Sequence, residues 1–172
     1  MELPGSNYLY TLAALAITYS GFAALFMLFR ENLAGKKLEY GAFLIRGVVQ
    51  KGFIVAACSM LPPLLFFVGL PQSAIWRLSS MVAATLQGLF LLTWVGQRRK
   101  VKGIPTSNWL LANLFLQFMT AFFLMLNAIG VFAEAGPGPF LIGVTLILGL
   151  SAIAYQEALI YLLHDRRAGP KK

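Results

Sequence analysis

The chain of 172 residues is 59% hydrophobic and only 12% charged, and it carries a formal net charge of +8. A soluble domain usually has about a quarter of its residues charged, so this composition, with a mean hydropathy of +0.75, excludes an ordinary soluble protein. The positive charge does not indicate a nucleic-acid partner, because the Lys and Arg residues flank apolar segments and form no basic patch. We therefore expect an integral membrane protein whose first partner is the lipid bilayer.

Five apolar segments occupy nearly the whole chain. Each is long enough for a spanning helix, which needs roughly 20 apolar residues. None alternates with a period of two over about ten residues, which excludes the strands of a membrane barrel. The sequence therefore predicts an all-α membrane protein, a single integral membrane domain over residues 1–172 with transmembrane helices in a compact bundle. The predicted helices cover residues 8–29, 40–70, 74–97, 107–132 and 140–164.

Basic residues gather in alternate gaps between these segments. The opposite gaps contain no Lys or Arg and hold Glu2 and Glu134. Because cytoplasmic loops carry the excess of Lys and Arg, this pattern places the amino terminus outside and the carboxyl terminus in the cytoplasm. We expect a multi-pass protein of a cell membrane. The basic residues on the expected cytoplasmic side are Arg30, Lys36, Lys37, Arg98, Arg99, Lys100, Lys102, Arg166, Arg167, Lys171 and Lys172.

The second predicted helix is too long for a simple crossing. As one straight helix, residues 40–70 would extend ~46 Å, whereas the hydrocarbon core is roughly 30 Å thick. Pro62 and Pro63 remove two backbone donors within this helix. The sequence therefore predicts that the second helix is kinked at Pro62 and Pro63.

Polar side chains recur on one face of the third and fourth predicted helices, at alternating steps of four and three residues. If the two helices pack antiparallel about a loop centred near Lys102, positions whose numbers sum to 204 lie at equal depth. Gln87 then faces Gln117, and Arg77 faces Asn127. The two faces comprise Ser73, Arg77, Ser80, Ala84, Gln87, Leu91 and Trp94 on the third helix, and Leu110, Asn113, Gln117, Thr120, Leu124 and Asn127 on the fourth.

Two interpretations of this polar stripe stay open at the level of sequence. Its amides could hydrogen-bond between helices, because lipid cannot satisfy them, with each bond contributing on the order of 1 kcal/mol. Alternatively, the same groups could line a pathway for water or a solute. The candidate stripe residues are Arg77, Gln87, Asn113, Gln117, Thr120 and Asn127.

Glu157 is the one acidic residue well inside an apolar segment, and ionisable groups within a membrane are functional candidates. It shares a helix face with Tyr161 and His164 near the cytoplasmic edge. By depth, its expected ion-pair partner is Arg46 or Lys51 on the second helix. The alternatives are a proton-linked or cation-binding carboxylate, and a side chain that reaches out to the headgroups.

An enzymatic role is not favoured by the sequence. Only one cysteine, Cys58, and one histidine, His164, are present, which disfavours a Cys/His metal cluster and a bis-His haem. No Ser-His-Asp constellation is evident, and Cys58 is expected to be an inert buried thiol. We expect no cofactor and no metal. A lipid- or quinone-modifying enzyme is a distant third alternative, since its pocket would have to use the few polar groups around Glu157.

Three stretches carry a resemblance to known sequences. They are the first helix from Tyr8 to Thr18, the segment from Arg46 to Pro63 with its Leu-Pro-Pro, and Ile-Trp-Arg-Leu-Ser-Ser at residues 75–80. Together they resemble uncharacterised small bacterial integral membrane proteins. The resemblance implies a bacterial inner-membrane location, and it implies no activity and no functional residue.

Two functions from different classes follow from this sequence. The first is a small transport or channel-like protein that acts as a homo-oligomer, with the polar stripe lining a path. The second is a non-catalytic accessory or structural membrane subunit of a larger complex. Small residues at helix-contact spacing, among them Ala16, Ser20 and Ala24, permit the close backbone approach that either role requires.

Overall fold

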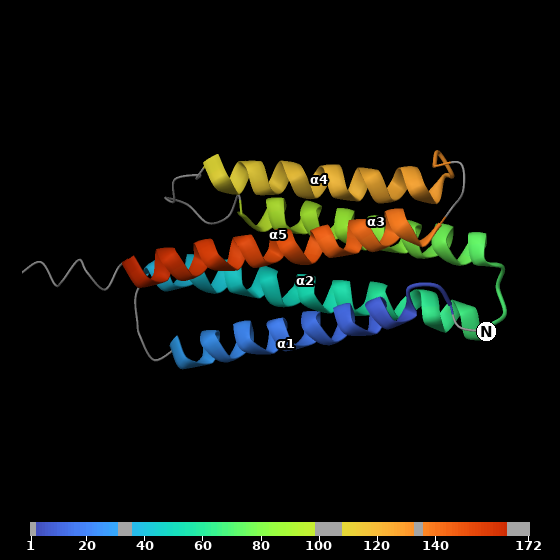
Figure 1. Cartoon of the computed structure of the whole chain (residues 1–172). Helices are drawn as coiled ribbons and strands as arrows, with labels where there is room; N and C mark the ends of the chain where they lie inside the picture. Colours follow the sequence, from blue (N-terminus) through green and yellow to red (C-terminus); the bar gives the residue numbers. More distant parts are fainter. Residues whose placement is uncertain (1–2, 31–35, 99–107, 133–135, 165–172) are drawn as a thin grey trace, which may run out of the picture.

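The computed structural model describes residues 3–30, 36–98, 108–132 and 136–164, with the side chains of 29–30, 36–42 and 161–164 left aside. Every regular element within these ranges is an α-helix, and consecutive helices run antiparallel to one another (Figure 1). The helices are α1 (Ser6–Arg30), α2 (Lys36–Phe67), α3 (Gln72–Arg98), α4 (Asn108–Ala128) and α5 (Pro137–His164). Their ends lie within four residues of the expected ones.

All five helices are long and apolar enough to cross a membrane. The all-helical prediction is therefore confirmed for the described part of the chain, and the protein has the form of a multi-pass membrane protein. In α2 the apolar run begins well before the middle of the helix, so that residues near position 50 belong to the span. The candidate spans are Ser6–Leu28, Phe43–Phe67, Gln72–Arg98, Asn108–Ala128 and Pro137–Ile160.

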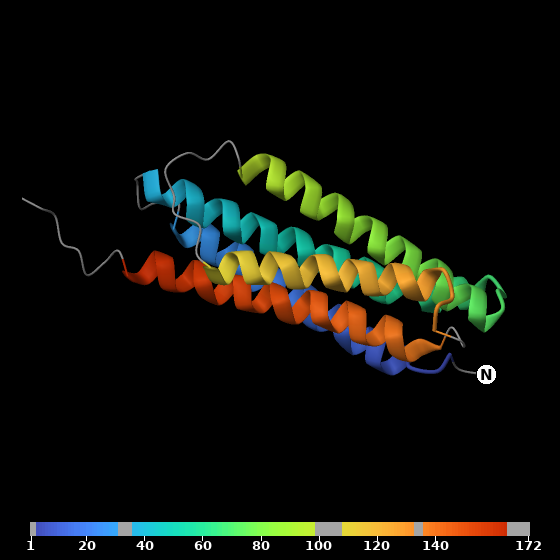
Figure 2. The same ribbon diagram turned by 90° about the horizontal axis from the view of Figure 1, so that it is seen from above.

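Helices α2, α3, α4 and α5 enclose a common interior, and α1 lies outside this ring. Neighbouring pairs around the ring are α2 with α3, α3 with α4, α4 with α5, and α5 with α2. Helix α1 packs chiefly along α2 and also touches α5, as the view from above shows (Figure 2). The interior of the ring is the place where side chains of four different helices meet.

Small residues set how closely α1 approaches α2. A Cβ atom placed on Gly52 would lie 1.7 Å from Ser20 Oγ and 2.9 Å from the Ala16 carbonyl oxygen. Contacts this short do not occur, so only glycine fits at position 52. Ala16 and Ser20 are both buried, in agreement with the small-residue contact expected on α1. Ala24 is half-buried.

Two tyrosines fasten α1 to α5. The Tyr8 hydroxyl lies 2.7 Å from Thr145 Oγ1, and the Tyr19 hydroxyl donates to the Ser151 carbonyl oxygen at 3.0 Å. A tyrosine ring buries apolar area while its hydroxyl needs a partner in the bundle. These bonds help to hold the outer helix against the ring.

Helix α2 continues through Pro62 and Pro63 to its end at Phe67. Both prolines are buried. Their missing N–H groups leave the Cys58 and Ser59 carbonyls without the usual helical donor. The kink at this pair stays a prediction.

Candidate functional site

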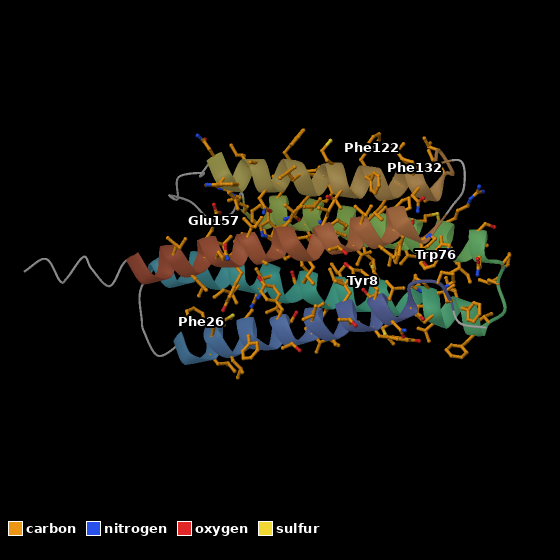
Figure 3. The ribbon with its side chains drawn as sticks, in the orientation of Figure 1. Tyr8, Phe26, Trp76, Phe122, Phe132 and Glu157 are labelled. Atoms are coloured by element: carbon orange, nitrogen blue, oxygen red, sulfur yellow. The ribbon has the colours of Figure 1, made fainter. Side chains whose placement is uncertain are left out.

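The polar face expected on α4 is the face that α4 buries. Its buried residues are the expected ones, spaced by three and four along the helix. Exposed positions between them carry large apolar side chains, Phe122 among them (Figure 3). The period of the polar residues therefore predicted the inward face correctly. The buried residues of α4 are Leu110, Asn113, Gln117, Thr120, Leu124 and Asn127.

The expected face of α3 is correct in its middle and wrong in its first two turns. Ser80, Ala84 and Gln87 are buried, but Ser73 and Arg77 are exposed. The reason is that Arg77 extends along the end of the bundle, where its Nη2 lies 2.9 Å from the position that a Cβ on Gly130 would occupy. A guanidinium reaches water from there without entering the interior.

Three amides form a hydrogen-bonded chain across the ring. Gln87 Nε2 donates to Gln117 Oε1 at 3.0 Å, Gln117 Nε2 donates to Asn113 Oδ1, and Asn113 Nδ2 donates to the Leu150 carbonyl oxygen at 2.9 Å. The chain links α3 through α4 to α5. The predicted pairing of Gln87 with Gln117 is thus confirmed, and all three amides are buried.

Asn127 does not pair with Arg77 as the depth rule predicted. Its Nδ2 donates to Ser80 Oγ at 2.7 Å, so its partner lies almost one helical turn deeper than expected. The shift arises because Arg77 turns outward and leaves the buried amide to the next inward residue of α3. Thr120 is buried but bonds the Leu116 carbonyl of its own helix at 2.9 Å, so it adds no link between helices.

The polar residues form a seam between α3 and α4. We use this name for Asn113, Gln117, Gln87, Ser80 and Asn127. From Asn113 to Asn127 the seam rises ~21 Å along α4, which is most of a hydrocarbon core of roughly 30 Å. Two acceptors in it, Gln87 Oε1 and Asn127 Oδ1, are buried with no hydrogen-bond partner among the described residues.

Lys51 is the buried charged residue among those whose side chains the structure describes, with 5% of its surface exposed. It lies eight residues inside the apolar span of α2 that begins at Phe43, or ~12 Å along the helix. Its Nζ sits over the Phe90 ring, 5.1 Å from the centroid. It forms no hydrogen bond or ion pair with any described residue.

A cavity of about 30 Å³ lies beside Lys51 inside the ring. This volume holds about two water molecules. Its polar lining comes from Lys51, Asn113 and Gln117, which join the cavity to the seam. The remaining lining side chains are apolar or aromatic: Leu44, Val48, Phe90, Leu91, Trp94, Leu110, Leu114 and Ala154, with Gly47 completing the wall.

The set expected around Glu157 does not assemble as an ion pair. Glu157 is half-buried towards the C-terminal end of α5 (Figure 3), and Arg46 is exposed. The structure brings Glu157 within ion-pair distance of neither Arg46 nor Lys51. The side chains of Tyr161 and His164 lie outside the described residues.

The buried position of Lys51 was missed because it was expected at the cytoplasmic edge. A signal for it was nonetheless in the sequence. Lys51 falls on a face with Leu44, Val48, Val55 and Cys58 at alternating steps of four and three, and all of these are buried. The same periodicity that placed Gln117 would have placed Lys51 inside.

The described residues contain no group of three or more His, Cys, Asp or Glu that could hold a metal ion. Cys58 is a free, buried thiol. No protein family, no curated protein and no solved structure matches the chain.

Proposed function

We propose that the protein is a small transport or channel-like protein of the bacterial inner membrane, which acts as a homo-oligomer. The proposed pathway runs within each chain, along the seam between α3 and α4 and past Lys51. The observation that carries this proposal is the Lys51 side chain, which is buried inside a candidate membrane span beside a cavity and has no hydrogen-bond or ion-pair partner among the described residues.

A charged side chain within a membrane span is costly, and most such residues face a partner, a water-filled cavity or an ion path. Lys51 lies beside a cavity, and the described part of the chain offers it no ion-pair partner. If Lys51 served only for packing, an apolar residue at position 51 would make the protein more stable, because a buried charge is expensive to desolvate. We therefore infer that the Lys51 side chain contacts a mobile species that enters the cavity.

The seam extends the polar lining beyond the cavity. Gln117 belongs to both, and Gln87 and Asn127 follow it across the membrane. Amides that serve only to join helices would satisfy one another's hydrogen bonds, yet Gln87 Oε1 and Asn127 Oδ1 have no partner among the described residues. A buried orphan acceptor costs about 1–3 kcal/mol. Water or a solute in the seam would supply the missing donors.

The proposed orientation follows the positive-inside rule. Arg30 at the end of α1, Lys36 at the start of α2 and Arg98 at the end of α3 lie at the same end of the bundle (Figure 1). With this end in the cytoplasm, the Lys51 cavity lies in the cytoplasmic half of the membrane. The amino terminus is then outside.

The second candidate is an accessory or structural subunit of a larger membrane complex. The bond between Gln87 and Gln117 favours it, because hydrogen bonds between buried amides of two helices contribute to helix-helix adhesion in lipid. In this case the seam would be dry and the solute permeability of vesicles would not change.

Permeability of reconstituted liposomes separates the two candidates. Stopped-flow light scattering would follow entry of potassium chloride, potassium gluconate, choline chloride and glycerol after an osmotic jump, with and without valinomycin, which lets potassium accompany an anion. We expect at least one solute to enter about tenfold faster than in protein-free liposomes, with the gain lost in Lys51→Met and Gln117→Leu. These changes remove the charge and the central amide of the path.

Arg46→Met is the matched control, since it removes one positive charge from an exposed position of the same helix. It should keep the permeability of the unaltered protein. If no solute enters faster than in empty liposomes, transport is refuted and the accessory role remains. Equal loss in Arg46→Met would refute the pathway past Lys51.

A further inference from the structure

The cavity beside Lys51 is rich in donors and poor in free acceptors. The Lys51 ammonium offers three N–H groups and none of them has a described partner. Asn113 and Gln117 each use one amide hydrogen and keep a second. Their carbonyl oxygens already accept bonds from Gln117 and Gln87. The species that completes this set is an acceptor.

The positive charge of Lys51 indicates which kind of acceptor fits the cavity. No acidic residue lines it, and Glu157 forms no ion pair with Lys51. An anion would neutralise the ammonium and take its hydrogen bonds at once, and such charge-assisted bonds are stronger than neutral ones. A cation would instead meet the positive charge of Lys51 in an apolar surrounding.

The size and the lining of the cavity restrict which anions can bind. About 30 Å³ of space accommodates a halide or a small oxyanion. Leu44, Val48 and Leu91 offer no hydrogen bonds in exchange for lost hydration. Weakly hydrated anions are therefore favoured over strongly hydrated ones, because less solvation has to be removed.

We propose that Lys51, Asn113 and Gln117 bind one small monovalent anion, of the size of chloride or nitrate. The assignment rests on the proposed transport function for its purpose, because it names the solute class that passes the cavity. The anion lies between α2 and α4, in the cavity that these three residues line, while the Lys51 ammonium itself sits over the Phe90 ring. Its binding is a property of a single chain.

Trp94 provides a built-in probe of this site. Its ring lines the cavity, and iodide is both a weakly hydrated anion and a quencher of indole fluorescence. The experiment uses the full chain in nanodiscs with the exposed Trp109 replaced by Phe. Iodide is titrated against gluconate at constant ionic strength, and acrylamide serves as an uncharged quencher.

We expect iodide quenching to saturate and chloride to compete with it. In Lys51→Met the saturable part should disappear, or its midpoint should rise at least tenfold, while acrylamide quenching stays unchanged. Quenching that rises linearly with iodide and is equal in the unaltered protein and in Lys51→Met would overturn the proposal. Gln117→Leu is the milder variant, and its midpoint should rise by a smaller factor.

Arg98 requires a control, because its guanidinium lies 5.7 Å from the Trp94 ring centroid and could itself attract iodide. The variant Arg98→Gln should keep the saturable quenching. Loss of quenching in Arg98→Gln with retention in Lys51→Met would place the anion at the bundle end and overturn the proposal.

A thermal measurement covers the case in which fluorescence of a variant cannot be interpreted. Replacing gluconate by chloride should raise the melting temperature of the unaltered protein, because a ligand that binds the native state stabilises it. The rise should vanish in Lys51→Met and persist in Arg46→Met. A rise of equal size in all three proteins would overturn the proposal.

The two proposals fail separately. Saturable quenching without solute entry into liposomes would keep the anion site and refute transport. Entry of glycerol or potassium with no saturable quenching would keep transport and refute the anion. Each result therefore identifies which step of the reasoning is wrong.

Discussion

Gln117 is the central residue of the amide chain, since it accepts from Gln87 and donates to Asn113. Removal of a central member leaves both neighbours unpaired. Removal of Gln87 leaves only the Gln117 carbonyl unpaired, and it also removes the orphan oxygen Gln87 Oε1. The two glutamines therefore differ in energetic weight although they pair with each other.

We predict that Gln117→Leu lowers the free energy of unfolding by about 2 kcal/mol and Gln87→Leu by about 1 kcal/mol or less, from the cost of unpaired buried groups and of interhelical bonds in lipid. Unfolding with SDS in mixed micelles would measure both. Thr85→Val is the control, because Thr85 is exposed and bonds only its own helix. A larger loss of unfolding free energy for Gln87→Leu than for Gln117→Leu would contradict the central place of Gln117 among the hydrogen-bonded amides.

At the scale of elements, the contact between α1 and α2 depends on the absence of a side chain at Gly52. Position 21 on α1 offers the opposite case, because a Cβ on Gly21 would have nothing within 4 Å. The pair therefore compares one helix contact with open surroundings. Sequence predicted the small residues of α1 but gave no sign of their partner on α2, since close approach depends on how the helices cross.

Gly52→Ala should destabilise the protein by about 1–3 kcal/mol, the usual cost of overpacking, whereas Gly21→Ala should be neutral or slightly stabilising because alanine favours the helix. Adding Ser20→Ala to Gly52→Ala should recover part of the loss, since it removes the Oγ that the new methyl group would meet. Thermal unfolding in detergent measures all three. Equal stability of the two glycine variants would show that α1 does not pack as described.

At the scale of the whole molecule, hydropathy predicted the helices, because lipid demands long apolar segments that satisfy their own backbone groups. The period of polar residues predicted the inward face of α4 and the bond between Gln87 and Gln117. The pairing predicted from equal depth was wrong for Arg77, because a long side chain at a bundle end can turn outward.

The depth predicted for Lys51 was also wrong. It was grouped with Glu157 at one edge of the membrane, although its face on α2 is buried along its length. The cavity beside it could not be predicted from the sequence, since its volume is what remains after side chains of α2, α3, α4 and α5 pack together. The orientation, the homo-oligomer and the solute stay predictions.

The central claim is that an aqueous path reaches Lys51 from the cytoplasmic side. Its most direct test is thiol labelling of Lys51→Cys in a Cys58→Ser background, with a small, anionic, membrane-impermeant methanethiosulfonate in vesicles of known orientation. Thiols react as thiolates, which form in water and not in a dry core. Arg46→Cys, at an exposed position, is the positive control, and Val55→Cys, at a fully buried position of the same helix, is the negative control.

We predict that Lys51→Cys reacts from the cytoplasmic side at a rate closer to that of Arg46→Cys than to that of Val55→Cys. If Lys51→Cys stays as unreactive as Val55→Cys while Arg46→Cys is labelled, the interior is dry and the pathway does not exist.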